Sequence, residues 1–209
     1  MSSDRPADPQ KDTIAALAAA LEEISQSDGS TFFDAEWEDQ KAAVWSRALK
    51  LLDHRARSVG ELRQRLKDLD LPTAVVNEVV EDLQRAGLLD DAHFAREWVR
   101  QRHHHKGKSR AVLRRELAEK LISAELQEEA LAMIDDADER AVATTLAAKK
   151  ARSVTVAPAS YEEYQKVLRR IVGVLARRGY PQGMSLSVAR EQLDQRIDDL
   201  GGAPGYDDD

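Results

Sequence analysis

Three copies of one hydrophobic pattern run along this 209-residue chain. Leu62 and Leu66 recur as Leu113 and Leu117, and again as Ile171 and Leu175, at intervals of 51 and 58 residues. Each interval holds three short helices and is too small to bury its own apolar surfaces well, so such units become stable when neighbours stack. The pattern therefore predicts an all-α chain of three tandem three-helix repeats, helix-turn-helix-like units that form an elongated, curved array.

The repeats lie between two polar segments, one at each end of the chain. We expect the repeats at residues 40–89, 90–137 and 138–197, each with three helices. Residues 1–39 are predicted to form an acidic, mostly disordered extension, and residues 198–209 a disordered acidic tail, because neither has enough apolar residues to build a core.

The stretch from Gly87 to Arg102 marks the passage from the first repeat to the second. Gly87 can take the left-handed conformation that ends a helix. Asp90 is a good N-cap for the next helix, and Phe94 opens its apolar stripe. Trp98 continues that stripe, which favours a core position over a base-stacking one.

Charge is segregated along the chain, so the net charge of −7 is a poor guide to partners. Residues 1–40 hold 10 acids and 2 bases, and the last three residues are all aspartate. The body between them carries a net charge of +4. Such a body can bind a polyanion through local basic patches.

Two clusters of basic residues are the main functional signal, because phosphate binding needs surface cations and guanidinium adds bidentate geometry. The first, between residues 96 and 115, contains one acid and offers as candidate contacts Arg96, Arg100, Arg102, Lys106, Lys108, Arg110, Arg114 and Arg115. The second, between residues 149 and 178, has Lys166 as an eighth base and offers as candidate contacts Lys149, Lys150, Arg152, Arg169, Arg170, Arg177 and Arg178. The alternative is that each cluster is an ordinary solvated face.

Catalytic chemistry finds little support in the sequence. There is no cysteine, phosphate loop, dinucleotide fingerprint or Ser/His/Asp arrangement. His103–His105 point in three directions on a helix and lack a ligand partner, so we interpret them as a helix end that adds donors to the basic patch. Asp90 and Asp91 are explained by capping. We therefore expect a binding protein without catalytic residues, cofactor or metal.

Location follows from what the sequence lacks. No apolar run approaches the roughly 18 residues of a membrane span, and the N-terminus has no secretory signal pattern. We expect a cytoplasmic protein without a membrane partner.

Three segments resemble the bacterial RecX family, the regulators of RecA recombinase. The first is Ala48-Leu49-x-x-Leu52-x-x-Arg55-x-Arg57-Ser58-x-x-Glu61-Leu62-x-x-x-Leu66. The second resembles the family's most specific signature and is Gly87-Leu88-Leu89-Asp90-Asp91-x-x-Phe94-Ala95-x-x-x-Val99-x-x-Arg102. The third is Leu175-Ala176-Arg177-Arg178-Gly179-Tyr180. The resemblance covers about residues 40–197, and it departs from the family at Lys120–Ser123, where a glycine turn is usual, and in a longer linker before the third long helix.

The resemblance implies a partner as well as a fold. It implies binding along the deep groove of the RecA filament on DNA, with inhibition of strand exchange, ATP hydrolysis and the co-protease role of the filament in recombination and SOS repair. We also expect weak, non-specific binding of single- and double-stranded DNA, and a monomer, because no dimer zipper is present. Two alternatives stay open: a sequence-specific helix-turn-helix transcription regulator and, ranked last, a nuclease that uses the histidines.

Overall fold

The computed structural model describes residues 35–202, and every regular element in that range is an α-helix. The all-α prediction is therefore confirmed. The predicted disorder of residues 1–34 and 203–209 lies outside the described residues. Residues 35–39, expected as part of the extension, instead open a helix that covers residues 35–54.

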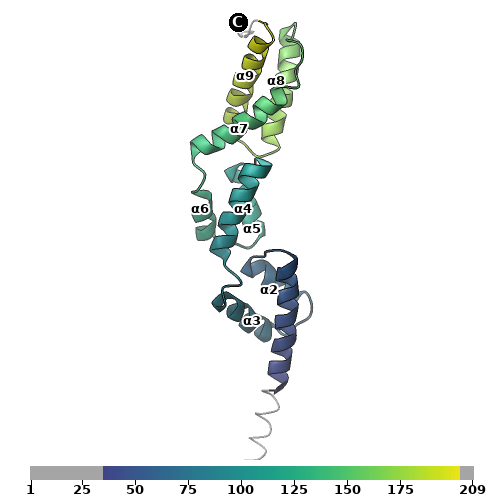
Figure 1. The fold of residues 1–209 in the computed structure, drawn as a ribbon, viewed down its shortest axis with the longest axis vertical. Coiled ribbons are helices and arrows are strands. Elements are labelled where there is room, and N and C mark those ends of the chain that lie inside the picture. The colour runs from purple at the N-terminus through teal and green to yellow at the C-terminus, as the bar shows by residue number, and fades with distance from the viewer. Residues whose placement is uncertain (1–34, 203–209) are drawn as a thin grey trace, which may run out of the picture. The chain divides into compact units, whose positions relative to one another are not determined.

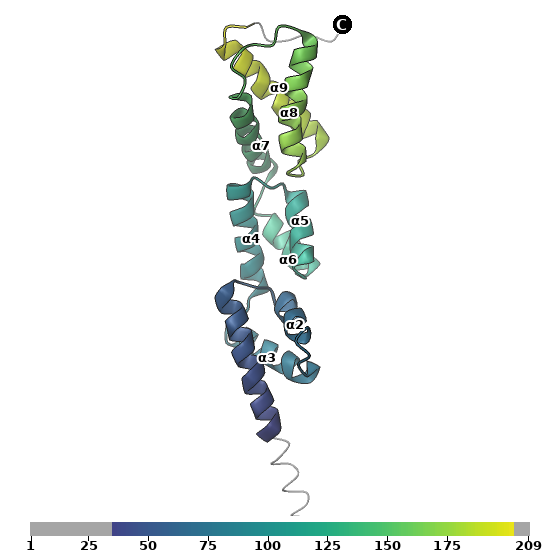
Figure 2. The same cartoon turned by 90° about the vertical axis from the view of Figure 1, so that its right-hand side faces the viewer.

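The helices follow one another with short connections (Figures 1 and 2). After the residue 35–54 helix they are α2 (Val59–Lys67), α3 (Thr73–Arg85), α4 (Asp91–Lys106), α5 (Arg110–Glu119), α6 (Ala124–Leu131), α7 (Asp136–Ala151), α8 (Tyr161–Ala176) and α9 (Gln182–Asp199). Helix α7 begins at Asp136, because Asp135 and Asp138 form a capping box there.

The described chain forms two compact units. The first comprises residues 35–55 and 63–82, and the second comprises residues 56–62 and 83–202. In the first unit the buried residues come from the residue 35–54 helix, α2 and α3, and they are Val44, Ala48, Leu66, Val75, Val76, Val79 and Val80.

The second unit contains two three-helix bundles, each with its own core (Figure 2). Helices α4, α5 and α6 form the middle bundle, and α7, α8 and α9 form the C-terminal bundle. The repeated pattern lies in these cores, since Leu113 and Leu117 of α5 and Ile171 and Leu175 of α8 are at most 1% exposed.

The start of α4 matches the sequence prediction closely. Gly87 has a φ of 71°, in the left-handed region. Asp90 is the N-cap and its side chain accepts a hydrogen bond from His93 N at 2.8 Å. Phe94 is buried and stacks on Trp98 with ring centroids 5.5 Å apart.

One left-handed residue follows the second helix of each three-helix group. These residues are Asp70, Leu121 and Gly179, with φ values of 55°, 58° and 82°. They are separated by 51 and 58 residues, the same intervals as in the hydrophobic pattern. Leu121 thus takes a left-handed conformation that usually favours glycine.

The turns at Leu121 and Gly179 each contact the start of an earlier helix within the second unit, and we call these two contacts the first and the second joint. At the first joint, Ser58 Oγ donates to Lys120 O, and Asp91 accepts from Val59 N at 2.8 Å. A Cβ on Gly60 would lie 2.5 Å from Leu121 Cβ, so the missing side chain permits the approach. This joint fixes the start of α2 against the middle bundle.

The second joint repeats this chemistry one period later. Ser109 N donates to Arg178 O at 3.0 Å, and Glu139 accepts from Arg110 N at 2.8 Å. In this joint the glycine belongs to the turn and not to the helix start, since a Cβ on Gly179 would overlap Val112. The start of α5 is thus held against the C-terminal bundle by three features like those at the start of α2, except that the backbone amide of Ser109 donates where the hydroxyl of Ser58 does.

Candidate functional site

The basic residues of the middle bundle are largely paired with carboxylates of the same bundle. Arg96 on α4 lies 3.0 Å from Glu129 on α6, and Arg114 on α5 lies 3.0 Å from Glu128. Arg100 pairs with Glu97 one turn earlier, and its donated hydrogen bonds hold the pKa of the Glu97 carboxyl below its usual value.

Glu116 neutralises two further bases beside Trp98. Its carboxylate accepts from Lys108 Nζ and from Trp98 Nε1, the latter at 3.0 Å, and lies 3.6 Å from Arg102 Nε. The Arg102 guanidinium stacks over the indole ring at 3.7 Å from its centroid. Trp98 packs against the middle core, as expected, while its edge anchors this charged group.

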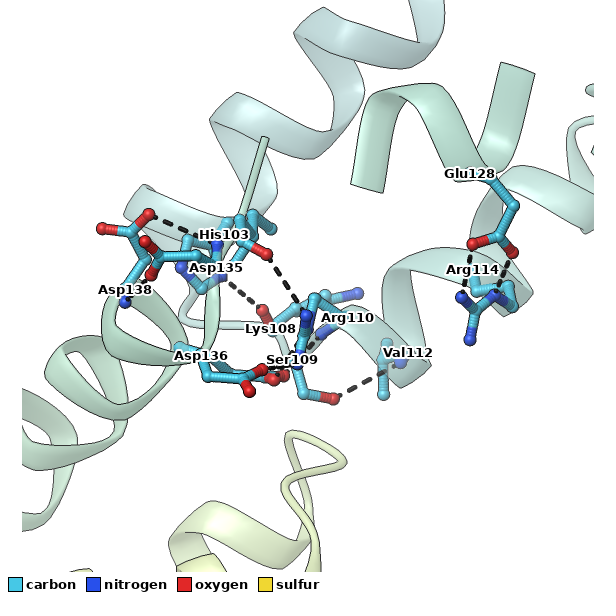
Figure 3. A network of polar contacts seen from close by, with 12 residues as sticks. His103, Lys108, Ser109, Arg110, Val112, Arg114, Glu128, Asp135, Asp136 and Asp138 are labelled. Atoms are coloured by element: carbon cyan, nitrogen blue, oxygen red, sulfur yellow. Dashed lines mark hydrogen bonds and ion pairs between the residues drawn. The ribbon is translucent and has the colours of Figure 1, made fainter. Parts of the chain in front are cut away.

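Arg110 belongs to the second joint. Its guanidinium contacts Asp136, lies 2.9 Å from Glu139 Oε2 and donates to Ile134 O (Figure 3). The Glu139 side chain is only 5% exposed. This candidate contact therefore connects α5 to the start of α7, whereas Figure 3 shows Arg114 pairing separately with Glu128.

The interpretation of the three histidines as donors on the basic patch is wrong for His103. That side chain is 1% exposed, and its Nδ1 lies 2.9 Å from Lys108 O. His104 and His105 are exposed at the end of α4. Within residues 35–202, no group of three or more His, Asp or Glu side chains is arranged to hold a metal ion.

The basic residues of the C-terminal bundle have a different environment. Among the described residues, no carboxylate forms an ion pair with Lys149, Lys150, Arg152, Lys166, Arg169, Arg170 or Arg177, and all but Lys150 are exposed. Arg178 instead turns back to donate to Lys106 O and Val174 O. The structure thus separates the candidate contacts into a mostly paired cluster, in which only Lys106 and Arg115 form no ion pair with a described residue, and an unpaired one.

Sequence reasoning missed the acids that make this difference. Glu128 and Glu129 lie 14 and 33 residues from the arginines they contact, and Glu139 lies 29 residues from Arg110. No local charge pattern could show such pairs, because they form only when the bundle brings α6 and α7 to the earlier helices. No described helix combines the length and hydropathy needed to cross a membrane.

Comparison with known proteins matches this architecture to one family. Residues 45–83 match the model of the first RecX three-helix domain, and residues 90–131 match the second. A protein of Corynebacterium efficiens named regulatory protein RecX is 51% identical over 199 residues, which cover 93% of this chain and 95% of the relative. The chain belongs to the RecX family.

Other RecX proteins agree at greater distance. The regulatory protein RecX of Streptomyces coelicolor is 35% identical over 151 residues, covering 72% of this chain and 78% of the relative. The crystal structure of RecX from Lactobacillus salivarius shares the fold with a TM-score of 0.62 at 23% identity, covering 74% of this chain and 97% of that one. The two matched RecX domains end at residue 131, so the unpaired basic cluster lies beyond both of them.

Proposed function

We propose that this chain is a cytoplasmic regulator of RecA that binds in the groove of the RecA filament on DNA. Binding there inhibits ATP hydrolysis, strand exchange and the co-protease activity of the filament. The observation that carries the proposal is membership of the RecX family across nearly the whole chain, with 51% identity to a protein named regulatory protein RecX.

The described surface supports a binding role. Most basic residues of the middle bundle pair with carboxylates, and Arg110 stabilises a joint, whereas Arg115 is exposed without an ion pair to a described residue. The exposed bases suit weak contact with DNA phosphates, which steers association without reading sequence. In this proposal the chain acts as a monomer, and neither a cofactor nor a reaction of its own is involved.

The direct test is RecA ATPase on single-stranded DNA, titrated with the purified chain. We expect a dose-dependent fall in the hydrolysis rate, with a parallel loss of strand exchange. Filter binding to random and selected duplexes, with and without RecA, provides the second measurement. Tight, salt-insensitive binding to one duplex without any effect on RecA would favour the transcription regulator instead.

A charge reversal in the middle bundle tests the contact surface. Arg114 and Arg115 are exposed on α5, so Arg114→Glu/Arg115→Glu should weaken inhibition while the helical content is unchanged. The introduced glutamates would repel acidic groups of the partner across the interface. The control is Arg65→Glu/Lys67→Glu on α2, with the same change of net charge at exposed positions. If both variants inhibit as well as the unmodified chain, this face of α5 is not the contact.

A further inference from the structure

The outer face of α8 carries a straight row of bases. Lys166, Arg170 and Arg177 are separated by four and seven residues, which places them on one side of an α-helix. That side is opposite the buried residues of α8, which are Tyr164, Leu168, Ile171 and Leu175. Arg169 lies at the edge of the row and is exposed too. We call Lys166, Arg170, Gly173 and Arg177 the α8 stripe.

Gly173 lies in the middle of the α8 stripe, a position inside a helix where glycine is unusual. Glycine inside a helix is less favourable than almost any other residue. No packing explains it, because the only group close to a Cβ built at Gly173 is the tip of Arg177, at 3.4 Å. Gly173 is half-buried, and the Arg177 guanidinium partly fills the space that the missing side chain leaves between the three cations. When that guanidinium turns to a phosphate, a ligand backbone can approach the helix closely.

The composition of this face indicates a polyanion rather than a protein surface. After Glu163, α8 contains no acidic residue. None of the large hydrophobic side chains that are exposed in the described chain comes from residues 162–178. Protein interfaces have an apolar core with charged residues depleted from it, whereas nucleic-acid contacts are dominated by cations on phosphate oxygens.

The contrast with the middle bundle strengthens this assignment. A cation that already has a carboxylate partner must lose that partner, or share it, before it neutralises a phosphate. Arg96, Arg100 and Arg114 have such partners within 3.0 Å. The cations of the α8 stripe form no ion pair with any described residue.

We propose that the α8 stripe is a binding site for the phosphate backbone of single-stranded DNA. The site rests on the proposed function, in which the chain works beside DNA enclosed by a filament. From Lys166 to Arg177 the helix rises about 16 Å, which is long enough to face several consecutive phosphates. Gly173 lets the strand lie against the helix, and the three side chains reach its phosphates from both ends of the gap.

The experiment compares two triple variants with the same change of net charge. One is Lys166→Gln/Arg170→Gln/Arg177→Gln in the stripe, and the matched control is Arg96→Gln/Arg100→Gln/Arg114→Gln in the middle bundle. Affinity for a labelled single-stranded oligonucleotide of mixed sequence is measured without RecA over a series of salt concentrations. Three lost phosphate contacts should reduce the slope of log affinity against log salt by about 2, at about 0.7 per contact. The control should change the slope by less than half as much.

Gly173→Gln tests the role of the gap without changing the charge. Glutamine is the better helix former, so the melting temperature should hold or rise. Affinity for the oligonucleotide should fall severalfold, because the new side chain covers the approach. Unchanged affinity in this variant, or equal slopes in the two triple variants, would overturn the proposal.

The RecA assay separates the failure of this site from the failure of the proposed function. If the stripe variant keeps its salt slope on DNA but no longer inhibits RecA ATPase, the stripe contacts protein and the DNA assignment is wrong. If the unmodified chain has no effect on RecA while the stripe still determines DNA binding, the site stands and the proposed function is wrong.

Discussion

Removing Glu139 should destabilise the chain far more than removing Asp136, although both carboxylates contact the same arginine. The Glu139 side chain is 5% exposed and accepts from Arg110 N at 2.8 Å and from Arg110 Nε at 2.9 Å. The Asp136 side chain is 86% exposed. The comparison therefore isolates burial, because the cationic partner is the same.

The expected size follows from these contacts. A hydrogen bond to a charged acceptor contributes about 1.5–3 kcal/mol. Arg110 is 37% exposed and keeps its contact with Asp136, so the low end applies to each of the two bonds lost in Glu139→Ala. We expect a loss of about 3 kcal/mol in the free energy of unfolding, because Arg110 N is also left without its acceptor. Asp136→Ala should cost at most about 1 kcal/mol, as is usual for an exposed ion pair.

Thermal unfolding followed by circular dichroism provides the measurement. For a chain of this length, about 3 kcal/mol corresponds to a fall of roughly 6–12 °C in the melting temperature. Glu139→Gln keeps one acceptor oxygen and should fall between the alanine variant and the unmodified chain. Equal melting temperatures for Glu139→Ala and Asp136→Ala would refute the reasoning, since burial would then have no effect on the joint.

Three further predictions concern other parts of the chain. Ser58→Ala loses an N-cap and a joint contact and should cost about 2 kcal/mol, against about 1 for the exposed N-cap variant Ser123→Ala; chemical denaturation measures both. Burial first, and then the charge of Glu139, raises the pKa of Tyr180 from 10 to about 12. The contribution of the protonated Tyr180 to stability is therefore complete below pH 10 and is lost as the pH rises toward 12. Absorbance titration and unfolding at high pH measure this. Deleting residues 1–34 should preserve helical content and RecA inhibition while strengthening non-specific DNA binding at low salt, because an acidic arm competes with phosphate; identical salt titrations would contradict the screening role.

Periodicity predicted most of the fold. The hydrophobic pattern located residues that are almost fully buried, as Leu113 and Ile171 show. Capping chemistry located the start of α4, because the Asp90 carboxylate satisfies an amide three residues away. Both signals are local, so a single sequence contains them. The start of the first helix was predicted less accurately, because residues 35–39 belong to that helix and not to the predicted extension.

The candidate site was harder to predict, because the availability of a basic side chain for a ligand depends on whether a carboxylate lies beside it in the fold. Arg114 and Arg170 look alike in the sequence, yet only Arg114 has a carboxylate partner among the described residues. His103 seemed part of a basic run, but its position on α4 directs its side chain into the interior, next to Lys108 O. Lys166 was left out of the candidate contacts, although the spacing of α8 places it on the same face as Arg170. These outcomes are set by tertiary packing, which charge counting does not contain.

The two joints have a consequence for how such chains can change during evolution. Each joint needs free space where a turn meets the start of an earlier helix. In the first joint Gly60 at the helix start provides that space, and in the second joint Gly179 in the turn provides it. Selection can therefore preserve the fit while neither position stays glycine in every copy. One whole period runs from Ser58 to the residue before Ser109. A gene segment that encodes it begins with the serine of one joint and is followed directly by the serine of the other. Duplication or loss of that segment would keep the spacing from one joint serine to the next.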